Sequence, residues 1–366
     1  MINIEYRTEN KDFEVFYNYI SNKKVAIVGD INTKPYLLEI KEKIEKYAKE
    51  VKCLIFEDKQ LVPDERAIDK TNILCQGMDY LLAVGSGTLN DLAKYVATIN
   101  NIESGILATA PSMDGYASKG SALMINLEKV TLNVNMPHDF LIDLKILCDA
   151  PKDMIASGFG DIVGKYTCLT DWKLSHIING EEINKKSYEM MEEALSNVIN
   201  SFESISSYQN EGIKYLMDAL VIAGLSMANC GNSRPASGSE HHQTHFLEMY
   251  FVKNQRLIPL HGIKVALGCL ISLELYKHLL VSKKEFEHKK EIIDLVNELP
   301  SVEYIKAMLI KMGCPTRFSS LDISKEVFID MLYNAYKVRD RYSILTFYAK
   351  HDLYDEMVDY LVENYY

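Results

Sequence analysis

The first 150 residues alternate short apolar runs with amphipathic segments, and this alternation restricts the possible folds more than any other feature. The apolar runs include residues 23–30 (KKVAIVGD), 52–56 (KCLIF) and 80–87 (YLLAVGSG), with helical patterns between them. Continuous apolar strands are typical of parallel sheets, because crossover helices bury both faces. The pattern predicts a doubly wound, mostly parallel sheet.

The periodicity changes near residue 150. Residues 103–149 still read as strand-like, whereas residues 185–205, 213–229 and 263–280 repeat apolar side chains at the three- and four-residue spacing of helices. A chain of 366 residues, 48% of them hydrophobic, is also long for one compact domain. We therefore expect an α/β nucleotide-binding domain over residues 1–150 and an all-α helical domain over residues 151–366.

Composition narrows the class of protein. The net charge is −11 and no Lys/Arg cluster is interleaved with aromatic residues, so nucleic acid is not an expected partner. Neither a signal peptide nor a membrane-length apolar run is evident, so we expect a cytoplasmic protein without membrane insertion. The seven cysteines are scattered, without a CxxC pair, and are expected to be reduced.

A glycine loop follows the third apolar run. Gly85, Ser86 and Gly87 stand between a predicted strand and a predicted helix whose first turn holds Asn90 and Asp91. The free N–H groups of a helix start attract anions, and glycine lets a phosphate approach the backbone. The loop is not the GxGxxG fingerprint, and a sharp turn needs glycine for steric reasons as well, so both interpretations stay open.

A second polar segment, residues 109–118 (TAPSMDGYAS), follows the next apolar run. Its small hydroxyl side chains and the Asp114 carboxylate could bind ribose, phosphate or substrate hydroxyls. The alternative is an ordinary turn built on Asp114 and Gly115.

One acid and several histidines form a candidate metal set. Asp161 is expected at the start of a helix after two glycines, with Lys165 four residues on and therefore on the same face. His241 and His245 should share one face of a short helix, and His261 stands at a predicted helix entry beside a glycine. One carboxylate and two neutral imidazoles bind a divalent cation and leave positions open, as catalytic sites require.

Two qualifications apply to this set. An acid near a helix start is often only a favourable dipole interaction, and spacing alone does not say which histidines are ligands. His242 points about 100° away from His241 on an ideal helix and is expected to face elsewhere.

Four strings carry a resemblance to a known family. In chain order they are GSGTLND, TAPSMDGYAS, MIASGFGDIVGKYTCLTDWKLS and SRPASGSEHHQTHFLEM. They closely resemble the glycerol-1-phosphate dehydrogenases, a branch of the iron-containing alcohol dehydrogenase and glycerol dehydrogenase superfamily that neighbours dehydroquinate synthase. The resemblance spans about residues 20–275, and its interval between His241 and His261 is similar to that of the bacterial members. It implies the architecture of that superfamily.

The resemblance also implies site residues and cofactors. The metal ligands would be Asp161, His241 and His261, holding one divalent ion such as Zn, Ni or Fe. The contacts to NAD(H) or NADP(H) would be Gly85, Ser86, Gly87, Thr88, Asn90, Asp91, Thr109, Ser112 and Ser118. The substrate-contacting and catalytic residues would be Asp114, Asp161 and His245. Independently of the resemblance, an acid after the second strand, Glu57 or Asp58, would favour NAD by pairing with the ribose hydroxyl and repelling a 2′-phosphate.

The implied activity is reversible, NAD(P)H-linked reduction of dihydroxyacetone phosphate to sn-glycerol 1-phosphate, a step of phospholipid metabolism, by a homo-oligomer. His245 would relay the proton and Asp114 would orient a hydroxyl. Arg234 and Lys165 are candidates for the phosphate, with a structural ion pair as the alternative. Three rival interpretations are a glycerol dehydrogenase for an unphosphorylated polyol, a dehydroquinate synthase-like lyase and a non-catalytic nucleotide-binding protein.

Overall fold

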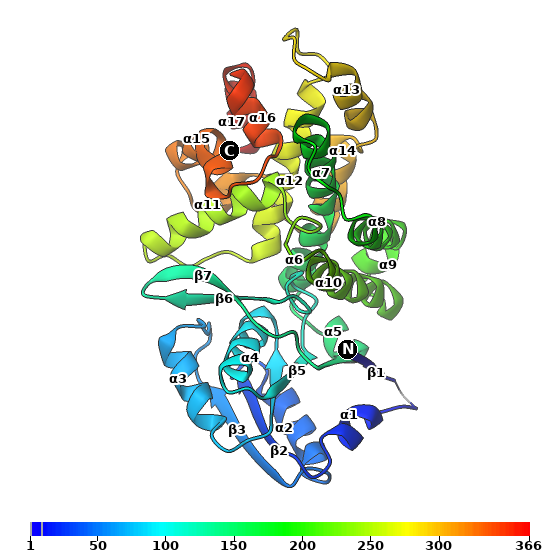
Figure 1. The fold of residues 1–366 in the computed structure, drawn as a ribbon, viewed down its shortest axis with the longest axis vertical. Coiled ribbons are helices and arrows are strands. Elements are labelled where there is room, and N and C mark those ends of the chain that lie inside the picture. Colours follow the sequence, from blue (N-terminus) through cyan, green and yellow to red (C-terminus); the bar gives the residue numbers. More distant parts are fainter. Residues whose placement is uncertain (1, 9) are drawn as a thin grey trace. The chain divides into compact units, whose positions relative to one another are not determined.

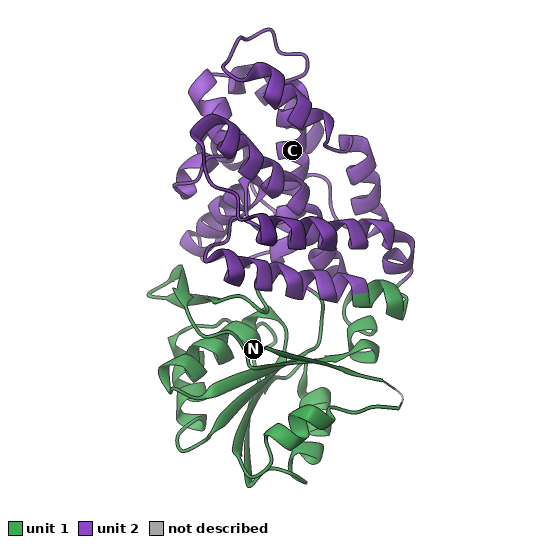
Figure 2. Cartoon of the chain, turned by 45° about the vertical axis from the view of Figure 1, so that its right-hand side comes forward, with its two compact units in different colours: residues 1–111, 115–151, 208–214 green, residues 112–114, 152–207, 215–366 purple. Residues whose placement is uncertain are grey.

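The computed structural model describes residues 2–8 and 10–366, which form two compact units (Figure 2). Unit 1 comprises residues 1–111, 115–151 and 208–214, and unit 2 comprises residues 112–114, 152–207 and 215–366. The short segment 112–114 thus groups with unit 2 although the residues on either side belong to unit 1. The domain boundary at residue 150 stays a prediction, since compactness does not show that either unit folds alone.

Unit 1 is built on a six-stranded sheet in the order β1-β8-β5-β4-β2-β3, in which every pairing is parallel. Figure 1 labels β1, β2, β3 and β5 of this sheet. Its strands are β1 (Asn3–Arg7), β2 (Lys24–Asp30), β3 (Glu50–Phe56), β4 (Tyr80–Gly85), β5 (Glu103–Ala108) and β8 (Asp139–Asp143). Its complete helices are α1 (Glu14–Tyr19), α2 (Lys34–Ile44), α3 (Glu65–Leu74), α4 (Gly87–Ile99) and α5 (Leu144–Cys148). The predicted parallel sheet is confirmed.

The first strand is one that the sequence pattern does not reveal. β1 carries polar side chains and lies at the edge of the sheet, where one side of the strand is unpaired and polar residues are tolerated. Its Glu5 is nonetheless buried, because the carboxylate accepts hydrogen bonds from the N–H groups of Val15 and Phe16 in α1. An antiparallel hairpin of β6 (Gly120–Ile125) and β7 (Glu128–Asn133) completes the strands.

Unit 2 is helical, as predicted. Its α-helices are α6 (Lys152–Val163), α7 (Lys165–Asn179), α8 (Lys185–Asn200), α9 (Phe202–Ser206), most of α10 (Asn210–Cys230), α11 (Ser239–Lys253), α12 (His261–His278), α13 (Lys289–Asn297), α14 (Val302–Lys311), α15 (Lys325–Asn334), α16 (Ile344–His351) and α17 (Val358–Tyr365). Three short 3-10 helices are η1 (Phe318–Leu321), η2 (Ala335–Val338) and η3 (Tyr354–Glu356). Residues 284–300 also space their apolar side chains as a helix would, but only Lys289–Asn297 (α13) is helical there.

The prediction that Asp161 opens a helix is wrong. Asp161 lies near the end of α6, which begins at Lys152 directly after Pro151. The two glycines before Asp161 do not break the helix but allow a close approach. A Cβ at Gly160 would lie 2.5 Å from the carbonyl oxygen of Gly262 in α12. The same-face prediction for Lys165 is confirmed, because its Nζ lies 3.0 Å from Asp161 Oδ1.

The expectation that no apolar run is long enough to span a membrane needs correction. Helix α10 is long and apolar enough to cross a membrane by length and composition, with a mean hydropathy of 1.3 over its most apolar window. Half of that window is buried, and core helices of soluble proteins can have the same length and apolar composition.

The seven cysteines are all free thiols, as expected, and four of them are buried.

Candidate functional site

Three side chains from three helices of unit 2 converge on one point. Asp161 of α6, His241 of α11 and His261 of α12 each offer a ligand atom, and these atoms lie within 4.8 Å of one another. Asp161 and His241 are buried, whereas His261 is partly exposed. His242 lies outside this cluster and is fully buried.

Close packing of α6 against α12 brings these ligands together. Gly262, next to His261, donates its backbone N–H to Ser157 Oγ at 3.0 Å. A Cβ at Gly262 would lie 1.8 Å from the carbonyl oxygen of Ser157, which no side chain allows. The glycine beside His261 therefore sets the position of the ligand by letting two helix backbones approach.

Two buried glutamates orient the histidine rings. His241 Nδ1 lies 2.8 Å from Glu240 Oε1, and His261 Nδ1 lies 3.0 Å from Glu248 Oε1. The second oxygen of Glu248 lies 3.0 Å from His245 Nδ1. A carboxylate at Nδ1 holds the proton there and turns Nε2 toward the cluster, the usual arrangement for metal-binding histidines.

Lys165 joins two carboxylates at the cluster. Its ammonium, fully buried, donates to Asp114 Oδ2 at 2.5 Å, to Asp161 Oδ1 at 3.0 Å and to the carbonyl of Ala236 at 2.8 Å. Burial acts to raise the pKa of Asp114, but the charge of Lys165, its hydrogen bond to Asp114 and the neighbouring His241 and His261 together outweigh burial, so the pKa is lowered. Burial acts to lower the pKa of Lys165, and the two carboxylates reverse this and raise it. Asp114 and Lys165 therefore form a charged pair.

Of the two predicted phosphate ligands, Lys165 is fully engaged within the protein and Arg234 is engaged in part. All three protons of the Lys165 ammonium have acceptors, so we do not carry that prediction forward. Arg234 is buried, and its Nη2 lies 2.8 Å from Glu181 Oε2, which is the ion pair considered as the alternative. The Nε and Nη1 atoms of Arg234 have no hydrogen-bond partner in the described part of the chain.

The donor set fits a divalent metal ion. Burial, and then the charge of Lys165, lowers the pKa of His241 well below its usual value, so the ring is neutral and can donate a lone pair. One carboxylate with two neutral imidazoles leaves further coordination positions for substrate or water.

In unit 1 the glycine loop occupies the carboxyl end of β4. The backbone N–H of Thr109 donates to the carbonyl of Gly85 at 3.0 Å, which joins the loop to the end of β5. Ser86 immediately precedes α4, and its hydroxyl lies 3.2 Å from the Tyr116 hydroxyl. The structure thus gathers Gly85, Ser86, Gly87 and Thr109 at the carboxyl ends of β4 and β5, where the N-terminus of α4 offers anion-binding N–H groups.

Other predicted nucleotide contacts already have structural partners. Asn90 donates from Nδ2 to the carbonyl of Tyr116 at 3.2 Å, and Asp91 Oδ1 lies 2.9 Å from Lys94 Nζ. Ser118 donates its hydroxyl to the carbonyl of Gly115 at 2.9 Å. The carbonyl of Ser112, in unit 2, accepts the hydroxyl of Ser157 at 2.9 Å. Thr88 lies in the first turn of α4, and Glu57 is exposed directly after β3.

Sequence reasoning missed several charged residues close to the cluster. Glu240 and Glu248 stand within the SRPASGSEHHQTHFLEM string, and their positions next to or three residues from a histidine were a usable signal. Arg339 was invisible, because it lies in a segment without a recognised motif. Its Nη2 nevertheless lies 3.0 Å from His245 Nε2.

Comparisons with known protein families and sequences point to the same family. Residues 10–151 match the iron-containing alcohol dehydrogenase family. Glycerol-1-phosphate dehydrogenase [NAD(P)+] of Bacillus licheniformis is 32% identical over 338 residues, covering 91% of this chain and 84% of the relative. The protein of the same name from the archaeon Pyrococcus horikoshii is 31% identical and covers 83% of this chain and 80% of the relative.

Solved structures share the fold at much lower identity. A probable glycerol dehydrogenase from Sinorhizobium meliloti superimposes with a TM-score of 0.72 at 16% identity, covering 99% of this chain and 97% of that one. Glycerol dehydrogenase from Schizosaccharomyces pombe gives a TM-score of 0.70 at 17% identity, covering 95% and 86%. These structures confirm the predicted architecture, and the more similar sequences decide the branch. The chain belongs to the glycerol-1-phosphate dehydrogenase family within the iron-containing alcohol dehydrogenases.

Proposed function

We propose that this protein is an NAD(P)-dependent, metal-dependent dehydrogenase that reversibly reduces dihydroxyacetone phosphate to sn-glycerol 1-phosphate. The observation that carries the proposal is the convergence of Asp161, His241 and His261 within 4.8 Å, beside the partly exposed His245. Relatives named for this activity cover most of the chain, which supports the same substrate.

Asp161, His241 and His261 would hold the divalent ion. When bound there, the ion supplies Lewis acidity toward a substrate oxygen, and the nicotinamide supplies or accepts the hydride. Asp161 gives the charged donor, and the two imidazoles are pointed by Glu240 and Glu248.

The chain's own polar groups manage the substrate hydroxyls and the proton. Asp114 stays ionised beside Lys165, so its carboxylate can accept a hydrogen bond from a substrate hydroxyl and orient it. His245 has Nδ1 against Glu248 and Nε2 toward Arg339, and its ring lies 6.1 Å from that of His261. From this position His245 would donate and recover the proton of the secondary alcohol.

The nucleotide is proposed to bind at the glycine loop of unit 1. The N–H groups at the start of α4 would meet the pyrophosphate, with Thr109 beside them. Gly85 allows this turn because a Cβ there would lie 2.3 Å from Leu89 Cδ1 of α4. Asn90, Asp91 and Ser118 would act mainly by holding the loop. Glu57 would favour NAD. Zinc, nickel or iron as the metal, a cytoplasmic location and a homo-oligomer are further parts of this proposal.

The test is oxidation of NADH with dihydroxyacetone phosphate, combined with metal removal and determination of the product's stereochemistry. We expect sn-glycerol 1-phosphate as product, loss of turnover after dialysis against a strong chelator and partial recovery with zinc, nickel or iron. Calorimetric titration of the metal-free protein should show one site per chain. Full turnover without metal would contradict the metal assignment, and equal rates with unphosphorylated dihydroxyacetone would favour a glycerol dehydrogenase.

A further inference from the structure

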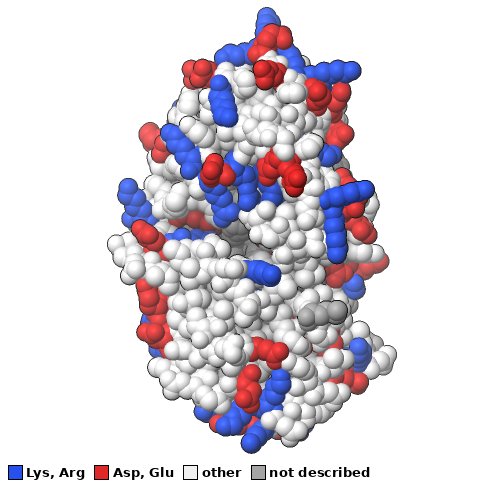
Figure 3. Space-filling model, viewed as in Figure 1, with Lys and Arg blue, Asp and Glu red and all other residues white. Residues whose placement is uncertain are grey.

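A cavity of about 810 Å³ in unit 2 is lined by an excess of cationic side chains. Five of its lining residues are cations, namely Arg234, Lys337, Arg339, Arg341 and Lys350, whereas Glu181 and Asp340 are its only acids. On the face that Figure 3 shows, basic and acidic side chains are interspersed. The cavity therefore departs from the charge balance of that face and of an acidic protein as a whole.

Two of these arginines lack a carboxylate partner. Among the residues that the structure describes, neither Arg339 nor Arg341 has an acidic group within ion-pair distance, whereas Arg234 is paired with Glu181. Burial, and then the charges of Arg234 and Arg339, lowers the pKa of Arg341 to about 10. Burial also lowers the pKa of Arg339. Crowded, partly buried guanidiniums of this kind lack a compensating anion.

The two guanidiniums meet at one hydroxyl. Arg339 Nη1 donates to Ser233 Oγ at 3.2 Å, and Arg341 Nη2 donates to the same oxygen at 3.1 Å. Arg341 Nη1 also donates to the carbonyl of Ser237. Each guanidinium keeps further N–H donors for a ligand. Two forks converging on one small polar group form a suitable geometry for an oxyanion with several acceptor oxygens.

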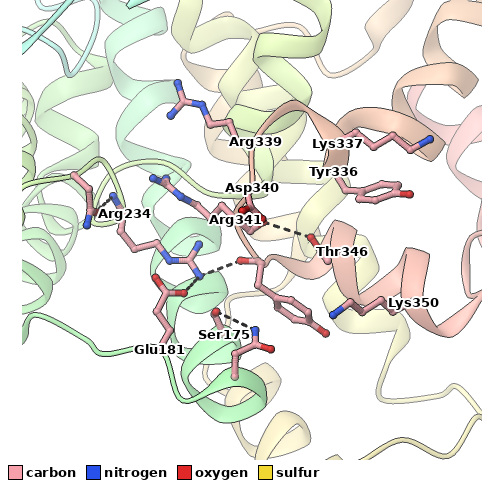
Figure 4. A pocket seen from close by; sticks show the side chains of 13 residues that line it. Ser175, Glu181, Arg234, Tyr336, Lys337, Arg339, Asp340, Arg341, Thr346 and Lys350 are labelled. Carbon is pink, nitrogen blue, oxygen red and sulfur yellow. Dashed lines mark hydrogen bonds and ion pairs between the residues drawn. The ribbon is translucent and has the colours of Figure 1, made fainter. Parts of the chain in front are cut away.

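Buried donors nearby also lack acceptors. Arg234, next to Ser233, is 1% exposed, and its Nε and Nη1 have no partner in the described residues. Such buried donors are costly unless a ligand or water satisfies them. Figure 4 shows Arg234, Arg339 and Arg341 together with the Glu181 partner of Arg234.

The cationic group also lies close to the proposed reaction centre. Arg339 Nη2 is 3.0 Å from His245 Nε2, and the His245 ring lies 6.1 Å from the rings of both His241 and His261. A three-carbon substrate held near the metal ligands could thus extend its far end past His245 toward Arg339.

We propose that Arg339 and Arg341, arranged around Ser233, bind the phosphate group of the substrate. This inference rests on the proposed function and replaces Lys165 as the phosphate ligand. The pair also distinguishes phosphorylated from unphosphorylated substrates, because an uncharged hydroxyl leaves both guanidiniums without an anion.

The experiment compares the metal-loaded variants Arg339→Gln and Arg341→Gln with the wild type on dihydroxyacetone phosphate and on unphosphorylated dihydroxyacetone. We expect the ratio of the two kcat/KM values to fall by about 10- to 100-fold in each variant, chiefly through KM for the phosphorylated substrate. The control Arg256→Gln removes a partly exposed cation of the same unit that is paired with Asp322, and it should leave the ratio unchanged.

Equal losses on both substrates would overturn the proposal, since they would mean that Arg339 only positions His245 or that the cavity is structural. A second measurement keeps the test independent of activity, namely calorimetric titration of the holoenzyme with inorganic phosphate. Binding should weaken in both variants and persist in the control, and binding unaffected by them would refute the site. If the wild type ignores dihydroxyacetone phosphate yet phosphate binding depends on both arginines, the proposed function fails and the anion site stands.

Discussion

The metal cluster of unit 2 and the glycine loop of unit 1 are built in opposite ways. The cluster depends on one carboxylate and two imidazoles from separate helices, with each imidazole held by a glutamate, as Glu248 holds His261. The loop depends on small residues and backbone groups at one strand end, where the backbone N–H of Thr109 donates a hydrogen bond to the carbonyl of Gly85. Substitutions should therefore act through metal affinity in unit 2 and through nucleotide affinity in unit 1.

Replacing a metal ligand should have the largest effect. Asp161→Asn removes the charged donor of the cluster, and loss of Lewis-acid stabilisation worth several kcal/mol should lower kcat/KM by roughly 1,000-fold or more. Metal content, measured by elemental analysis, should fall in parallel. Asp153→Asn, an exposed acid on the same helix, should retain both metal and activity. A metal-free but active Asp161→Asn protein would break the comparison.

The helix contact behind the cluster should be the next most sensitive point. In Gly262→Ala the new methyl would collide with the Ser157 backbone, so we expect a loss of roughly 3 kcal/mol or more in the free energy of unfolding. Gly77→Ala in unit 1 meets open space and strains only the backbone at φ +70°, costing about 1 kcal/mol. Thermal unfolding of both variants measures the difference. Equal losses in the free energy of unfolding would mean that α6 and α12 can move apart at little cost.

Loss of the residue that positions two histidines should act on the metal without removing a ligand. Glu248→Gln leaves one acceptor oxygen where His245 and His261 now have two, so metal affinity should fall by about 10- to 100-fold. Competition with a chelator of known affinity measures this. Glu189→Gln, an exposed glutamate of α8, is the matched control. Unchanged affinity would show that the rings are held by packing alone.

A hydroxyl beside the glycine loop should give a smaller effect confined to the nucleotide. Tyr116→Phe removes the bond to Ser86 and the one donated to the Ala110 carbonyl, worth about 1 kcal/mol, so KM for NADH should rise about fivefold. Metal affinity should not change. Tyr47→Phe, an exposed tyrosine of the same unit, serves as the control. A change in metal affinity would contradict the division of roles.

The two regions also differ in how much the sequence predicts. The glycine loop follows from local pattern, because strand, turn and helix are neighbours in the chain. For the cluster, residue chemistry and resemblance indicate Asp161, His241 and His261, but the helix boundary around Asp161 was misplaced. Glycine normally signals a helix end, and only the contact of Gly160 with Gly262 shows why it stands inside α6.

The sequence does not indicate Arg339 and Arg341 as site residues, for a related reason. They are about 100 residues from the histidines in the chain, and no periodicity or motif links RDR to SRPASG. Their role depends on a cavity and on the absence of a carboxylate partner in the described chain, and both are properties of the folded unit. The edge strand β1 was missed because its polar residues do not alternate clearly.

The smallest expected effect concerns the choice of nucleotide. Glu57 is exposed directly after β3, while Asp58 is paired with Arg66 at 2.9 Å, so Glu57 is the better candidate to pair with a ribose hydroxyl and repel a 2′-phosphate. Glu57→Gln should lower the preference for NADH over NADPH by about three- to tenfold, since one exposed charge contributes on the order of 1 kcal/mol. Comparing kcat/KM for the two nucleotides tests this. If Asp58→Asn shifts the preference and Glu57→Gln does not, the discriminating acid is Asp58. The nucleotide region would then depend on a carboxylate that Arg66 holds, as the metal cluster depends on histidines that glutamates hold.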